Sequence, residues 1–280
     1  MKEFLSFAEA LADASSAMLV EAARRPHEGE KKSDGSPVTS IDRAVEARLR
    51  EMIADAYPDH GIVGEEHGAE NPGTGHVWVL DPIDGTLAFL AGLPVYGTLI
   101  ALLEGGVPVI GIIDMPATNE RWVGAAGSPT TRNGAAARVR ACEDLSQAML
   151  STSNIDFYGD DDLPALERLK AATRWTVYGG SCMAYAQIAS GRIDVGVDVA
   201  FDVFDYLALV PIIAGAGGII TDWQGKPLTL ASGDRLIAAG DRRAHTAALA
   251  VLAGQDESSI REKSAHPQGE ENATLGKTNN

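Results

Sequence analysis

The chain has 280 residues, of which 45% are hydrophobic and 22% charged, with a formal net charge of -16 at pH 7. These values predict a globular protein with a full hydrophobic core. The acidic balance argues against nucleic acid or an anionic membrane as partner, because both are bound through Lys and Arg. There is no signal-peptide layout and no apolar run near the roughly 18–20 residues that span a bilayer. We therefore expect a cytoplasmic protein with Cys142 and Cys182 as free thiols.

The first half of the chain is predicted to contain two helices followed by a sheet. Apolar residues recur at helical spacing over residues 4–25 and again over about 40–57. Segment 28–40 is rich in Gly, Pro, Ser and charge, and is predicted to be a loop. From Gly61 onward, short apolar runs broken by Gly and Pro favour strands, and 97–114 has the pattern of two strands joined by a Gly-Gly turn.

In the second half, strand patterns alternate with helix patterns, which predicts an α/β arrangement. We expect strands at residues 148–153, 174–180 and 193–198, and helices between them at 163–172 and 181–191. The sequence becomes polar after about Ala253, which predicts disorder. We therefore predict an N-terminal α+β half at residues 1–143, a C-terminal α/β half at 144–254 and a disordered polar tail at 255–280.

The stretch "WVLDPIDGTLAFL" (78–90) ends an apolar strand in two carboxylates, Asp81 and Asp84. A turn or a helix cap uses such residues, but a cap needs only one acceptor. Two carboxylates at the tip of a buried strand repel each other, and a shared divalent cation removes that conflict. Oxygen ligands without Cys or His favour Mg²⁺ or Mn²⁺ over zinc. A helix that begins at Gly85 and Thr86 would direct its N–H groups to the same place, which suits a phosphate group.

Three motifs together resemble a known family. "DPIDGT", the upstream "GEE" (64–66) and a later aspartate on a helix are similar to the motifs of the inositol monophosphatase family of Mg²⁺-dependent, lithium-sensitive phosphatases. The resemblance extends from about Phe4 to Ala253. It implies a layered αβαβα sandwich of the sugar-phosphatase type and a phosphomonoesterase activity. It also implies two or three Mg²⁺ per site, with Mn²⁺ as a substitute and Li⁺ as an inhibitor.

The same resemblance assigns the metal ligands. The first metal would be held by Glu65, Asp81 and the backbone carbonyl of Ile83, and the second would lie between Asp81, Asp84 and Asp205. Asp205 stands thirteen residues before Gly218, the second glycine of a pair, as in the family's later motif. The competing assignment is Asp202, in the similar string "FDVFD".

The resemblance implies that Thr86, Asp42 and Glu65 are the catalytic residues. Thr86 and Asp42 would orient and activate the water. Asp42 also has the spacing of a capping box with Thr39, and one residue can have both roles. Glu66 is either a further metal-site group or a solvated side chain, and the sequence does not choose between them.

The substrate side is most similar to the branch of histidinol-phosphate phosphatases. The residues that it assigns to substrate or phosphate are Asp84, Gly85, Thr86, Gly180, Ser181, Cys182 and Asp198. Ser181 replaces an aspartate of that branch, Asp198 replaces a glutamate, and Leu87 and Ala88 replace a Lys-Ser pair.

The predicted reaction is therefore hydrolysis of a small-molecule phosphate monoester, with L-histidinol phosphate as the first choice. Inositol 1-phosphate or another polyol or sugar monophosphate is the alternative. A non-catalytic relative that only binds metal or ligand is the alternative from a different class. Homodimers are common in the family, so a homodimer is an open expectation. Cys182 is expected to pack beside the pocket rather than act as a nucleophile.

Overall fold

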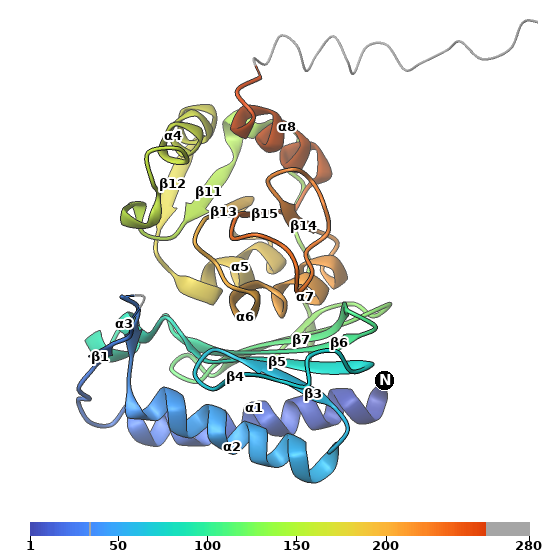
Figure 1. Ribbon diagram of the computed structural model, residues 1–280. Helices are drawn as coiled ribbons and strands as arrows, with labels where there is room; N and C mark the ends of the chain where they lie inside the picture. The colour runs from blue at the N-terminus through green and yellow to red at the C-terminus, as the bar shows by residue number, and fades with distance from the viewer. Residues whose placement is uncertain (34, 256–280) are drawn as a thin grey trace, which may run out of the picture.

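The computed structural model describes residues 1–33 and 35–255. Its elements form five layers, in the order helices, sheet, helices, sheet, helices (Figure 1). The predicted layered sandwich is therefore confirmed. The predicted tail, except for its first residue, lies outside the described residues.

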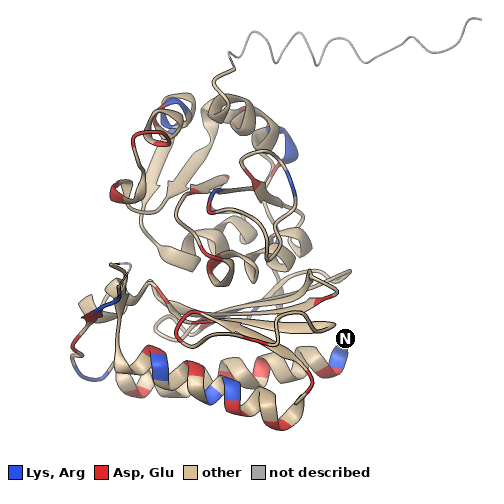
Figure 2. Ribbon diagram, viewed as in Figure 1, with Lys and Arg blue, Asp and Glu red and all other residues tan. Residues whose placement is uncertain are grey.

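Two long helices, α1 (Lys2–Ala22) and α2 (Ser40–Ala56), cover the outer face of the larger sheet (Figure 1). Each buries one apolar stripe, and charged residues recur between the buried positions: both signs along α2, and mainly Asp and Glu along α1 (Figure 2). Thr39 caps α2: its side chain accepts hydrogen bonds from the N–H groups of Ile41 and Asp42, and Asp42 accepts one from Thr39 N. Both predicted helices are confirmed to within a few residues.

The segment between these helices was predicted to be a loop, and this is wrong in part. It contains a small hairpin of β1 (Glu30–Lys31) and β2 (Pro37–Val38). The turn is closed by bonds from Lys32 N to Ser36 O at 2.8 Å and from Gly35 N to Lys32 O at 3.0 Å. Strands of two residues are too short to produce a visible alternation in sequence, which is why the pattern did not reveal them.

The larger sheet has eight strands in the order β10-β9-β8-β7-β6-β5-β3-β4. Only the β3–β5 pair is parallel. The predicted hairpin at 97–114 is confirmed as β6 and β7. The strands are β3 (Gly61–Gly64), β4 (Gly68–Glu70), β5 (His76–Asp84), β6 (Gly97–Glu104), β7 (Val107–Met115), β8 (Glu120–Ala125), β9 (Thr131–Arg132) and β10 (Ala135–Ala136).

The second sheet has five strands in the order β12-β11-β13-β15-β14, in which β11 is parallel to both of its neighbours. Its strands are β11 (Met149–Thr152), β12 (Trp175–Tyr178), β13 (Val195–Asp198), β14 (Ile219–Asp222) and β15 (Leu236–Ala239). Helices α5, α6 and α7 lie between the two sheets, and α4 and α8 cover the far face (Figure 1). These helices are α4 (Leu163–Ala172), α5 (Ser181–Ala189), α6 (Val203–Tyr206), α7 (Leu209–Gly215) and α8 (Arg242–Leu252), and the short helices are α3 (Thr86–Ala91), η1 (Leu145–Gln147) and η2 (Ile155–Phe157).

Strand β5 is buried on both faces, which explains its continuous apolar run. Val77 and Val79 belong to the core shared with the middle helices, while Trp78 and Leu80 belong to the core beneath α1 and α2. A strand buried on both sides carries apolar residues at every position instead of alternating with polar ones. Within residues 1–33 and 35–255, no helix combines the length and the apolar character needed to cross a bilayer.

Candidate metal centre

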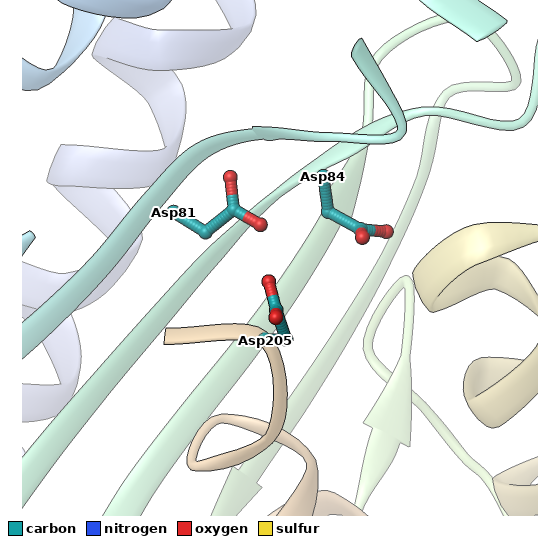
Figure 3. A group of neighbouring side chains, drawn as sticks. All are labelled: Asp81, Asp84 and Asp205. Atoms are coloured by element: carbon teal, nitrogen blue, oxygen red, sulfur yellow. The ribbon is translucent and has the colours of Figure 1, made fainter. Parts of the chain in front are cut away.

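The candidate site lies at the carboxyl end of β5, between the two sheets. The pairing of β5 with β6 is regular up to Asp81 and shifts between Asp81 and Asp84. Figure 3 shows both aspartates grouped with Asp205, which comes from α6 and faces the end of β5. One carboxylate oxygen from each of the three residues lies within 4.8 Å of the others. The fold thus brings together residues from both halves of the chain.

The start of α6 decides which of two aspartates enters this cluster. Asp202 is the N-cap of α6 and is exposed, whereas Asp205 occupies the third helical position. Asp202 N donates a hydrogen bond to Asp205 Oδ2 at 2.7 Å, which fixes the Asp205 carboxylate at the helix start. Asp205, and not the alternative Asp202, is therefore the residue that faces Asp81 and Asp84.

Glu65 reaches the same cluster through the parallel pairing of β3 with β5. Gly64 pairs with Leu80, and Glu65 N donates to Leu80 O at 3.2 Å, so Glu65 follows β3 beside the end of β5. Burial raises the pKa of Glu65 to about 7, while the nearby Lys32 opposes the shift. Burial, followed by the charges of Glu65, Asp84 and Asp205, raises the pKa of Asp81 well above its ordinary value. Burial and the charge of Asp84 do the same for Asp205.

Lys32, on the β1–β2 hairpin, supplies a positive charge that sequence patterns did not indicate. Its Nζ lies 2.7 Å from Glu65 Oε1 and 2.6 Å from Glu66 Oε1. The Glu66 side chain is only 3% exposed, so it is not a solvated group. Lys32 and Glu65 are 33 positions apart in the sequence, which is why no local pattern could predict the contact.

The donor set fits a hard divalent cation. Asp81 is 1% exposed, and its Oδ1 has no hydrogen-bond partner among the residues that the structure describes. An orphaned carboxylate oxygen in a cluster of like charges is costly unless a cation binds there. The side-chain oxygens that converge here belong to the carboxylates of Asp81, Asp84 and Asp205, and Mg²⁺ or Mn²⁺ prefers such oxygens.

Thr86 and Asp42 lie beside this cluster and contact each other. Thr86 Oγ1 is 3.1 Å from Asp42 Oδ1 and 3.0 Å from the carbonyl oxygen of Ile83. The other oxygen of Asp42 accepts hydrogen bonds from Thr39 N at 2.8 Å and Thr39 Oγ1 at 2.5 Å. Asp42 therefore completes the helix cap and also accepts a hydrogen bond from the Thr86 hydroxyl, while its role in activating water stays a prediction.

The turn after β5 packs against the start of α5. Gly85 has φ +84°, and a Cβ at this position would lie 2.5 Å from Ser181 Oγ, so only glycine fits. Gly180 and Ser181 also have positive φ, and Cys182 N donates to the Asp84 carboxylate. Residues 180–182 thus lie against the candidate site, as predicted from the sequence.

Cys182 is a packing residue in this arrangement. It is 3% exposed, and its Sγ lies 3.3 Å from the sulfur of Met115. Burial, together with the charge of Asp84, raises the pKa of the Cys182 thiol well above its ordinary value. A neutral, enclosed thiol is a poor nucleophile. Both cysteines are free and buried.

Asp198 is engaged by neighbouring donors and is only 3% exposed. Ser153 N donates to its Oδ1 at 2.6 Å, and the hydroxyl of Tyr185 donates to its Oδ2 at 2.6 Å. Burial raises its pKa to about 6, against the effect of these bonds. Its contact with substrate stays a prediction, and such a contact requires one of these bonds to be shared or exchanged. The sequence did not reveal Tyr185 as a partner.

Comparison with known proteins gives consistent results. The model of the inositol monophosphatase family matches residues 1–257. The chain is 40% identical to the bifunctional phosphatase IMPL2 of Arabidopsis thaliana, over 90% of this chain and 75% of that protein. It is 32% identical to a histidinol-phosphatase of Chlorobaculum parvum, over 80% of this chain and 86% of that protein. The solved structure of an inositol monophosphatase from Zymomonas mobilis superposes with a TM-score of 0.83 at 38% identity, covering 90% of this chain and 98% of that one.

Proposed function

Because this chain belongs to the inositol monophosphatase family and is therefore a phosphomonoesterase, we propose that it hydrolyses L-histidinol phosphate in a Mg²⁺-dependent reaction. The observation that carries the proposal is the cluster of Asp81, Asp84 and Asp205, with Thr86 and Asp42 beside it. The choice of substrate is supported by the relative named histidinol-phosphatase.

The proposed metal ligands are the side chains of Glu65, Asp81, Asp84 and Asp205 and the carbonyl oxygen of Ile83. Two or three Mg²⁺ would occupy them, Mn²⁺ would substitute, and Li⁺ would inhibit. When bound, Mg²⁺ supplies positive charge that neutralises the phosphate and makes water easier to deprotonate. The fit of these residues to such ions rests on the orphaned oxygen of Asp81 and on the all-oxygen donor set.

The chain's own residues would hold and move the proton. Asp42 Oδ1 accepts the hydrogen bond of the Thr86 hydroxyl, so Thr86 Oγ1 can in turn accept a hydrogen bond from the attacking water. The water oxygen forms the new bond to phosphorus while its proton passes through Thr86 Oγ1 to Asp42. The ester P–O bond breaks, and the departing alcohol oxygen takes up a proton from solvent water. The backbone at Gly85, Thr86 and residues 180–182 would bind and orient the ester.

Inositol 1-phosphate is the second candidate substrate, because the Zymomonas mobilis structure is named an inositol monophosphatase. The neutral Ser181 and the engaged Asp198 leave fewer free carboxylates for the amino group of histidinol. We expect small-molecule phosphate esters in either case.

The test is release of inorganic phosphate from histidinol phosphate, inositol 1-phosphate, sugar phosphates and nucleotides, each with and without Mg²⁺. Preference for histidinol phosphate supports the proposal, whereas turnover of inositol 1-phosphate alone supports the second candidate. Failure to hydrolyse any ester while Mg²⁺ still raises the melting temperature indicates a non-catalytic relative.

We also propose a homodimer and a cytoplasmic location. The dimer is supported by the edge strand β12, where Trp175 and Val177 are 55% and 42% exposed. The location is supported by the two free thiols. Light scattering on the purified protein gives the mass of the assembly, and Trp175→Ser should shift it toward the monomer.

A further inference from the structure

Glu46 is a fully buried carboxylate on α2, one helical turn after Asp42. Its Oε2 accepts a hydrogen bond from Glu66 N at 2.7 Å. Its Oε1 accepts bonds from His67 N at 3.2 Å and from Arg50 Nε at 2.7 Å. Both oxygens are thus satisfied, and two of the three donors are backbone groups of the turn that follows β3.

The end of β3 is shaped to admit this carboxylate. A Cβ at Gly64 would lie 2.1 Å from Glu46 Oε1, so the strand carries no side chain where the carboxylate passes. Arg50 neutralises the charge from the outer side and also donates to Gly68 O, beyond the same turn. Helix α2 and the turn at 65–68 are therefore joined by a set of polar contacts around the buried carboxylate of Glu46.

This turn carries Glu65 and Glu66. Glu65 N is bonded to Leu80 O on one side, and the next two N–H groups are bonded to Glu46 on the other. The backbone of Glu65 is thereby fixed relative to β5, which carries Asp81. Mutation of a group that orients a metal ligand typically lowers metal affinity or activity by about 10–100-fold.

We infer that Glu46 is a positioning residue for the metal centre: it fixes the turn from which Glu65 and Glu66 face the ion. The inference rests on the proposed function, since it requires Glu65 to be a metal ligand. Helix α2 then supports the site twice, because Asp42 holds Thr86 and Glu46 holds the Glu65 turn.

The test is calorimetric titration of the full chain with Mg²⁺ and with Mn²⁺, without substrate, at a temperature where circular dichroism shows every variant folded. Glu46→Asp keeps the charge but shortens the arm, and Glu46→Gln keeps the length but removes the charge. We expect both to raise the metal Kd by about 10–100-fold. Glu51→Gln is the matched control, since Glu51 is an exposed residue of the same helix that pairs with Arg48, and its Kd should equal that of the wild type.

Arg50→Met provides a second test at a position whose side chain is 14% exposed, against 0% for Glu46. It removes the charged donor from Glu46 Oε1 and leaves that oxygen bonded only to His67 N, so positioning predicts weaker metal binding. A purely electrostatic effect predicts the opposite, because the variant loses a positive charge.

The inference would be overturned if both Glu46 variants bound the metal as tightly as the wild type. It would also be overturned if only Glu46→Gln bound the metal more weakly, because the charge alone would then explain the effect. Either result would leave the proposed function intact. Tighter binding by Arg50→Met would overturn the inference as well. No saturable binding by the wild type would overturn the proposed function, and the inference with it.

Discussion

Thr86 Oγ1 lies 3.1 Å from Asp42 Oδ1, although 44 positions separate the two residues in the sequence. The contact joins the first turn of α2 to the first residue of α3, at the tip of the strand that carries Asp81. Asp42 is held by Thr39 through its other oxygen, so the carboxylate has little freedom to turn away. The oxygen of Thr86 is thus held beside the carboxylate cluster, within hydrogen-bond distance of both Asp42 Oδ1 and the carbonyl oxygen of Ile83.

Thr86→Val should lower kcat by about 10²–10⁴-fold, the usual range for a group that assists proton transfer. Valine keeps the shape but cannot bond Asp42 or accept a proton from water. KM and the Mg²⁺ dependence should change much less, as steady-state kinetics at several Mg²⁺ concentrations would show. Thr118→Val, which loses only a bond to Met115 O in a turn, is the control. A kcat within threefold of wild type would contradict the role of Thr86.

Asp81→Asn should have opposite effects on activity and on the stability of the metal-free protein. Activity should fall by more than about 100-fold. Loss of a group that only hydrogen-bonds a metal ligand already lowers metal affinity or activity by about 10–100-fold. The metal-free melting temperature should rise, because one of several mutually repelling buried charges is removed. A gain of about 1 kcal/mol corresponds to about 2 °C in a chain of this size.

Melting curves with and without Mg²⁺ measure both effects. The wild type should gain stability from Mg²⁺, and Asp81→Asn should gain little. Near-normal turnover by this variant would exclude the assignment of Asp81 as a ligand of both metals.

Local sequence order explains which parts of the site could be predicted. Asp81, Asp84, Gly85 and Thr86 are adjacent in the chain, so their chemistry is visible as a single motif. The layers of helix and sheet follow from the apolar periodicity of the sequence. The apolar residues of that pattern form the two hydrophobic cores on the two faces of β5. Asp205 could be placed only by its distance from a double glycine, and its orientation depends on the cap at Asp202.

Contacts between distant residues explain what could not be predicted. Lys32 meets Glu65 and Glu66 only after a hairpin of two-residue strands has formed. Tyr185 reaches Asp198 from a neighbouring helix, and nothing in either local sequence indicates the bond. Such contacts are set by tertiary packing, which propensity and periodicity do not encode.

Lys32→Met should tighten the binding of Mg²⁺ in the absence of substrate. The ammonium group lies within 2.7 Å of Glu65 and Glu66 and so competes with a metal ion for the same negative charge. One unit charge a few ångströms away is worth about 1–4 kcal/mol in water or near a protein surface, so we expect roughly a tenfold lower Kd. Calorimetric titration with Mg²⁺ measures the change.

Lys31→Met is the matched control for this variant, because it removes the same charge from an exposed position on the same hairpin. Equal effects of the two substitutions would mean that only the overall charge of the hairpin matters. Weaker Mg²⁺ binding by Lys32→Met would show that Lys32 supports the metal site instead of competing for it.

His245 should make the protein less stable as the pH falls from about 6.5 to 4. The residue lies on α8, is 3% exposed and contacts Thr221 Oγ1 through Nε2 at 2.9 Å. Burial, assisted by the charge of Arg242, lowers its pKa to about 4. Between this value and the ordinary 6.5, the unfolded chain binds a proton that the native protein does not, so stability is lost as the pH decreases. The loss approaches about 3 kcal/mol at pH 4 and is absent above pH 6.5.

His245→Gln isolates this contribution from that of the carboxylates, which also titrate in this range. Glutamine cannot take up the proton, so the difference in unfolding free energy between wild type and variant should shrink by about 3 kcal/mol from pH 7 to pH 4. Urea unfolding at half-unit pH steps provides the two curves. The variant also loses packing contacts, but this loss is the same at every pH. It lowers the whole curve of unfolding free energy against pH and does not change how the two curves differ in slope. Parallel curves across the whole range would mean that His245 takes up its proton in the native state as readily as in the unfolded chain.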